Sequence, residues 1–141
     1  MKNRVAIFVA ALWWGSLTTL GFFVVPMLFA HLGNPRIAGG MAAQLFTVQS
    51  YLGAVCGVVL LAVLKPDQPV AGVNTAQAAT VLIVLGMLLA LLLEFAVAPR
   101  IVSARALGAD LRLWHGVGSA MYVAQWLCAG AVLGKLSARR A

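Results

Sequence analysis

Long uncharged stretches dominate the pattern of hydrophobic and polar positions along the chain. Four of them lack Lys, Arg, Asp and Glu: Val5–Pro35, Ile37–Leu64, Gln68–Leu93 and Leu113–Gly134. An α-helix rises about 1.5 Å per residue, so about 20 apolar residues cross a hydrocarbon core of about 30 Å. The pattern therefore predicts an all-α integral membrane bundle, up-down-up-down, in a single domain over residues 1–141. We expect its four transmembrane helices at residues 5–29, 38–64, 75–98 and 113–136.

The polar segments between the stretches contain residues that begin or end helices. The segment His31–Gly40 contains Gly, Asn and Pro, and we expect it to be a loop. The segment KPDQP at 65–69 contains two prolines that stop the second helix. Asp110 is the predicted N-cap of the fourth helix. The amphipathic, basic segment Pro99–Arg112 either lies along the interface or extends the third helix. We find no convincing internal repeat.

Composition agrees with a membrane protein and argues against a nucleic-acid-binding one. Hydrophobic residues make up 63% of the chain and charged residues 9%, against roughly half and a quarter in soluble domains. The net charge is +7, but the Lys and Arg residues lie at the ends of the apolar stretches, as membrane anchoring requires. One side of the membrane would receive Lys2, Arg4, Lys65, Lys135, Arg139 and Arg140, and the other Arg36, Arg100, Arg105 and Arg112. This bias favours cytoplasmic termini.

One end of the predicted bundle collects most of the polar chemistry. That end combines the ends of the first and third helices with the starts of the second and fourth. It holds His31, Arg36, Gln44, Glu94, Arg100, Arg105, Asp110, Arg112 and His115. Glu94 lies about one turn inside the third helix and His115 about one turn inside the fourth. We expect the two side chains to face each other at similar depth.

Helical spacing adds further polar groups to this interior. His115, Ser119, Tyr122 and Trp126 share one face of the fourth helix, and Gln44, Thr47 and Tyr51 share one face of the second. The candidates for ligand binding or proton exchange are Glu94, His115, Arg100, Gln44, Tyr51, Ser119, Tyr122 and Trp14. Hydrogen bonding between helices is the alternative role of the uncharged ones. For Glu94 the alternative is an ion pair with Arg100, although charged residues within membranes tend to be functional.

Small and sulfur-containing residues indicate helix packing and a candidate metal site. Gly53-x3-Gly57 and Gly130-x3-Gly134 are typical helix-packing motifs. We expect Cys56 and Cys128 to be small core residues at similar depth. Three methionines lie toward the polar end, which keeps copper as a candidate ligand there. His115 and His31 are the candidate metal ligands.

Several motifs together resemble a known family. They are WWGSLTTLGFFVVPMLF in the first helix, AGGMAAQLF opening the second, Glu94 with Pro99 and Arg100, and LWHG opening the fourth. This order is similar to the bacterial family called domain of unknown function 4149, itself similar to eukaryotic transmembrane protein 205. The resemblance implies a four-helix bacterial inner-membrane protein and no established reaction. It places Trp14, Gly15, Pro26, Phe46, Glu94, Pro99, Arg100 and His115 at motif positions.

A more distant likeness is to four-helix copper-resistance and haem-biosynthesis membrane proteins, in which histidines near one face bind metal or haem. The chain departs from a two-haem pattern because it contains two histidines in all.

Three hypotheses follow for the function of a protein embedded in a lipid bilayer. The first is a non-enzymatic module that binds or passes a small solute, ion or proton, since a carboxylate and an imidazole in a half-dry pocket can exchange a proton near neutral pH. The second is a haem- or copper-binding redox protein that uses His115 and His31. The third is a structural subunit that docks another membrane protein or a second copy. No soluble-enzyme motif is visible in the sequence.

Overall fold

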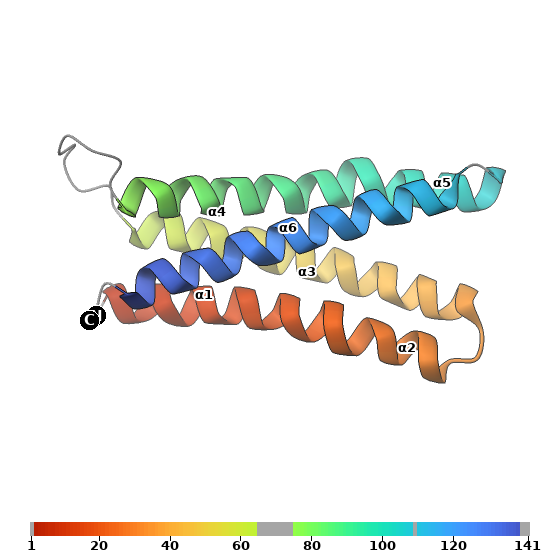
Figure 1. Ribbon diagram of the computed structural model, residues 1–141, viewed down its shortest axis with the longest axis horizontal. Coiled ribbons are helices and arrows are strands. Elements are labelled where there is room, and N and C mark those ends of the chain that lie inside the picture. The colour runs from red at the N-terminus through yellow and green to blue at the C-terminus, as the bar shows by residue number, and fades with distance from the viewer. Residues whose placement is uncertain (1, 65–74, 109, 139–141) are drawn as a thin grey trace.

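Four helical rods form an antiparallel bundle in the computed structural model, which describes residues 2–64, 75–108 and 110–138. The first rod consists of α1 (Lys2–Thr19), the π-helical turn η1 (Leu20–Val24) and α2 (Val25–His31). The second is α3 (Pro35–Val63). The third consists of α4 (Thr75–Leu92), the π-helical turn η2 (Leu93–Val97) and α5 (Ala98–Leu107), and the fourth is α6 (Leu111–Ala138). The rods alternate in direction, and α1 begins at the end where α6 finishes (Figure 1).

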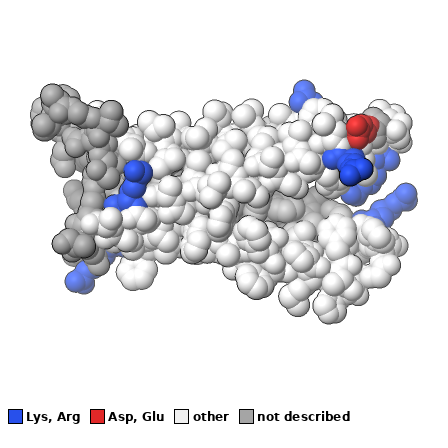
Figure 2. Space-filling view, in the orientation of Figure 1, with Lys and Arg blue, Asp and Glu red and all other residues white. Residues whose placement is uncertain are grey.

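The bundle has the dimensions and composition of a multi-pass membrane protein. Four helices are long and apolar enough to cross a bilayer: Arg4–His31, Pro35–Val63, Gln77–Leu107 and Leu111–Ala138. On the face drawn in Figure 2, the coloured charged side chains lie at the two ends and the middle is uncharged. The predicted all-α membrane bundle is confirmed.

The first connection at the polar end is shorter than predicted. Only Leu32–Asn34 separate α2 from α3, and Gly33 adopts a φ of 57° in the turn. The Asn34 side chain accepts a hydrogen bond from the Arg36 backbone N–H at 2.9 Å. Pro35 starts α3 because a first-turn proline lacks only an N–H that the helix leaves unpaired anyway. The predicted loop through Gly40 was therefore wrong.

The second connection follows the sequence pattern. Of the two alternatives for Pro99–Arg112, helix extension is observed, since α5 continues the third rod to Leu107. Gly108 ends that rod at a φ of 69°. The Asp110 carboxylate accepts a hydrogen bond from the Leu113 backbone N–H at 3.0 Å, so the predicted N-cap is confirmed. The predicted stop at KPDQP lies outside the described residues.

Burial reveals an internal repeat of a two-helix hairpin, which the sequence analysis did not recognise. In α1 the buried positions Ala6, Ala10, Trp13 and Leu17 correspond in spacing to the buried positions Ala79, Ile83, Gly86 and Ala90 of α4. In α3, Gln49, Gly53, Cys56 and Leu60 correspond to the buried Gln125, Ala129, Val132 and Leu136 of α6. The same residue spacing is therefore buried in both hairpins.

The two π-helical turns occupy matched positions in this repeat. The segments LGFFVVP (Leu20–Pro26) and LEFAVAP (Leu93–Pro99) share Leu, Phe, Val and Pro at the same places. Each π turn ends just before the residue that precedes the proline. A proline removes an N–H and clashes with the carbonyl four residues back, so the helix must adjust there. π turns occur frequently at functional sites.

Matched positions also contact each other across the bundle. The rings of Phe46 and Tyr122 meet edge to face with centroids 5.2 Å apart. The Trp13 ring lies 2.8 Å from the point where a Cβ on Gly86 would sit. The α1–α3 hairpin and the α4–α6 hairpin therefore contact each other through matched positions.

Candidate functional site

A cavity of about 360 Å³ lies at the polar end of the bundle, between the two hairpins. Most of its wall is aliphatic or aromatic, with polar groups from a few side chains. Its lining residues are Gly21, Phe22, Val25, Phe29, Gly39, Ala42, Ala43, Phe46, Leu93, Glu94, Ala98, Ile101, Val102, Arg105, His115, Gly118, Ser119, Tyr122 and Val123. Figure 2 shows the surface hollowed along the side of the bundle near this end.

The cavity includes both members of several repeat-related pairs. Gly21 corresponds to Glu94, Gly39 to His115, Ala43 to Ser119 and Phe46 to Tyr122, and all eight residues line it. In the first three of these pairs, the residue of the first hairpin is glycine or alanine, which has no polar side-chain group. The polar chemistry of the cavity therefore comes mainly from the second hairpin.

The Tyr122 side chain forms part of the cavity wall and reaches the backbone of the first rod. Its hydroxyl donates to the Leu17 carbonyl at 2.8 Å. In an uninterrupted α-helix this carbonyl would accept from the Gly21 backbone N–H. The hydroxyl thus supplies a donor to this carbonyl beside η1. Gly21 is required because a Cβ there would lie 2.5 Å from the Tyr122 ring.

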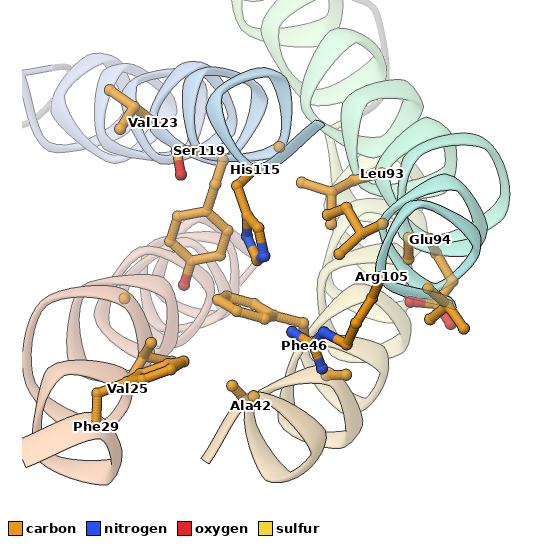
Figure 3. A pocket seen from close by; sticks show the side chains of 18 of the residues that line it. Val25, Phe29, Ala42, Phe46, Leu93, Glu94, Arg105, His115, Ser119 and Val123 are labelled. Carbon is orange, nitrogen blue, oxygen red and sulfur yellow. The ribbon is translucent and has the colours of Figure 1, made fainter. Parts of the chain in front are cut away.

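Glu94 lies in η2 and is tied to the second rod. The Thr47 hydroxyl of α3 donates to Glu94 Oε1 at 2.9 Å. Figure 3 shows Glu94 beyond Leu93 and Arg105 and not directed at His115. Glu94 and His115 line one cavity, as their predicted depth implied. The prediction that the two side chains face each other was wrong. The Glu94 carboxylate turns toward Thr47 because the Thr47 hydroxyl donates a hydrogen bond to it.

Arg105 and His115 supply the groups that point into the cavity. In Figure 3 His115 extends inward from α6, and the Arg105 guanidinium extends toward Ala42 and Phe46. Arg105 packs against Gly39, where a Cβ would lie 2.9 Å from its Nη2. Among the described residues, no carboxylate forms an ion pair with Arg105. Both side chains can therefore donate hydrogen bonds to a ligand.

The sequence analysis placed Arg105 at the polar end but did not select it for the site. A signal was present, since Glu94, Ala98, Ile101 and Arg105 follow helical spacing on one face and all line the cavity. These four residues share one face if the third helix continues past Pro99. That continuation was one of two alternatives left open.

Four of the eight candidates for ligand binding or proton exchange do not line the cavity. Gln44 is exposed on α3, and Tyr51 is 57% exposed. Arg100 does not pair with Glu94; its guanidinium lies 4.9 Å from the Trp114 ring centroid. Trp14 stacks on Trp126 at 5.8 Å. Gln44 and Tyr51 were wrong as inner-face residues because the face of α3 that packs carries small residues such as Ala38, Ala42 and Gly53. Thr47, the third residue of the predicted stripe, is half-buried and donates to Glu94 of the third rod.

The two histidines lie in different environments, and the two cysteines are core residues. His31 is exposed, its Nδ1 lies 3.0 Å from the Met27 carbonyl, and it does not line the cavity. Among the described residues, no group of three or more His, Cys, Asp or Glu side chains is arranged to hold a metal ion. Cys56 and Cys128 are both buried and unpaired with each other. Of the two candidate metal ligands, His115 lines the cavity and His31 does not.

Comparison with known proteins adds a family and no reaction. The model of a family described as domain of unknown function (DUF4149) matches residues 8–110. No curated protein and no solved structure matches the chain. The likeness to transmembrane protein 205 and to copper-resistance or haem-biosynthesis proteins stays a prediction.

Proposed function

The chain belongs to the family of domain of unknown function 4149, and we propose that it is a membrane module that binds a small molecule in the cavity between its two hairpins. One observation carries this proposal. A volume of about 360 Å³, mostly apolar walls and a few converging polar side chains occur together at one place. These are the properties of small-molecule sites, which fall at about 300–1,000 Å³.

The position of the cavity supports the same function. In transporters built from repeats, ligand sites lie at the interface between the repeats. Here residues from both hairpins line the cavity, and two π-helical turns form part of its wall. Binding, with or without passage across the membrane, is therefore the function that the geometry supports best.

Solute binding has more support than proton passage through a Glu94/His115 pair. A proton relay needs the two groups within hydrogen-bond reach of each other or of one water. The Glu94 carboxylate instead accepts from Thr47. In the proposed function, His115, Arg105, Ser119 and Tyr122 surround the ligand, and Glu94 holds the third rod against α3.

The other two hypotheses have less support. A redox centre would rest on His115 without His31, since His31 does not line the cavity. A docking subunit would need its small-residue faces free, but three of the four glycines in the two helix-packing motifs pack inside the chain, and Gly134 alone of the four is exposed. Gly53 lies against Trp13, Gly57 against Met87, and Gly130 against Trp14.

We further propose a bacterial inner membrane as the location, with both termini cytoplasmic. The basis is the bias of Lys and Arg toward the end opposite the cavity. The cavity then lies near the outer face of that membrane.

A matched pair of glycine substitutions tests ligand binding. Gly118 lines the cavity, whereas Gly116 is exposed, does not line it, and has no neighbour within 4 Å of an added Cβ. Protein purified in mild detergent would be analysed by mass spectrometry for small molecules released on denaturation. We expect a molecule at near-stoichiometric amount in wild type and Gly116→Leu and its loss in Gly118→Leu. Equal amounts of every released species in all three proteins would refute the proposal.

A further inference from the structure

We propose that the ligand is a single-chain amphiphile with an anionic carboxylate or phosphate head, which Arg105 and His115 recognise. This inference rests on the proposed small-molecule function and names the class of molecule. It follows from the charge of the cavity, its asymmetry and its opening.

The charge of the cavity favours an anion. Two charged side chains, Glu94 and Arg105, line it together with the imidazole of His115 and the phenol of Tyr122. Glu94 accepts a hydrogen bond from Thr47, whereas Arg105 has no carboxylate partner among the described residues. A guanidinium presents a rigid fork of donors that matches carboxylate and phosphate oxygens. The charged or titratable side chains seen to point inward are thus a guanidinium without a carboxylate partner in the described part of the chain and an imidazole (Figure 3).

The polar side chains of the cavity belong to the second hairpin. His115 and Ser119 correspond to Gly39 and Ala43 of the first hairpin, which have no polar side-chain atoms. The first hairpin contributes Phe22, Val25 and Phe29 to the wall instead. A ligand that fits this distribution has one polar head and one apolar body. Gly39 also leaves the space that the Arg105 guanidinium occupies.

The opening determines where such a molecule comes from. The hollow in Figure 2 lies along the side of the bundle, where acyl chains surround a membrane protein. Arg105 belongs to the last turn of α5, so a head group bound there lies near the membrane surface while its tail extends toward the bilayer interior. The volume, near the lower limit for ligand sites, favours one chain over two.

Fluorescence quenching by bromine-labelled amphiphiles tests this assignment. Phe22 lines the cavity and contacts Trp126, with ring centroids 5.4 Å apart. A bromine on a bound tail would therefore quench Trp126. Detergent-solubilised protein is titrated with ω-bromododecanoate and with ω-bromododecanol, which has the same tail and an uncharged head. We expect the carboxylate to bind about tenfold or more tightly than the alcohol, as a hydrogen-bonded charge implies.

Two arginine variants separate the head-group interaction from general charge. Arg105→Gln should abolish the preference for the carboxylate, whereas Arg112→Gln should keep it, because Arg112 is exposed at the same end and does not line the cavity. Far-UV circular dichroism checks that both variants fold. A preference that Arg105→Gln leaves unchanged would overturn the assignment.

The same titration distinguishes the failure of this inference from the failure of the proposed function. Gly118→Leu gives the baseline for partition of each probe into the micelle. Equal, saturable quenching of wild type by both probes, lost in Gly118→Leu, would overturn the anionic head and keep the cavity as a binding site. Quenching of wild type by both probes at the Gly118→Leu baseline would overturn both.

Discussion

Replacing Tyr122 with Phe tests the contact that shapes both the cavity and the first π-helical turn. The substitution removes the hydroxyl that donates to the Leu17 carbonyl at 2.8 Å. Tyr122 is 8% exposed, so water does not readily replace it. Hydrogen bonds between membrane helices are each worth about 0.6 kcal/mol and at most about 1.7. Because the buried Leu17 carbonyl also loses its partner, we expect a loss of about 1–2 kcal/mol, which shifts the unfolding equilibrium roughly tenfold.

The assay is a reversible titration of micelle-bound protein with sodium dodecyl sulfate, followed by circular dichroism. Tyr51→Phe is the matched control, since Tyr51 is 57% exposed and its hydroxyl has no partner among the described residues. It should change stability by less than about 0.5 kcal/mol. If Tyr122→Phe destabilises the protein no more than Tyr51→Phe does, the hydroxyl does not join the two rods and this reasoning fails.

Three further substitutions test other parts of the structure by the same titration. Gly86→Val should cost about 1–3 kcal/mol through overpacking, because its Cβ would lie 2.8 Å from the Trp13 ring; an unchanged midpoint would contradict the contact between the hairpins. Thr47→Val should cost about 0.6 kcal/mol, and its effect should be less than additive with Glu94→Gln because the two share one hydrogen bond. Asp110→Ala should cost about 0.5–2 kcal/mol by uncapping α6, and a smaller loss would show that the cap is dispensable.

The four helices were predictable because membrane spans are set by length and hydrophobicity, which are local properties of the sequence. Helix ends were less predictable. Asp110 has one dominant role before a helix and was assigned correctly, whereas Pro35 fits either a turn or a first helical turn. The repeat escaped the sequence analysis because it is carried mainly by which positions are buried, and residue types differ at positions such as Trp13 and Gly86.

The site was predictable in place but not in detail. Uneven distribution of His, Glu and Arg located the polar end, and depth brought Glu94 and His115 to one cavity. Side-chain direction depends on which face of each helix packs. On α3 that face is marked by small residues, so Gln44 and Tyr51 were assigned to the wrong side. Thr47 then decides where Glu94 points, and no pattern along one helix encodes that contact.

The most direct test of the central claim is to map where an amphiphile contacts the protein. A fatty acid with a photoreactive diazirine at its tail would be cross-linked in micelles, and the labelled residues would be identified by peptide mass spectrometry. The cavity predicts labels from both hairpins, on Phe22–Phe29 of the first and on residues around Ser119 and Val123 of the second, with loss of both sets in Gly118→Leu. Labels spread over outward residues such as Val55, Val84 and Leu127, and unchanged by that substitution, would contradict the account.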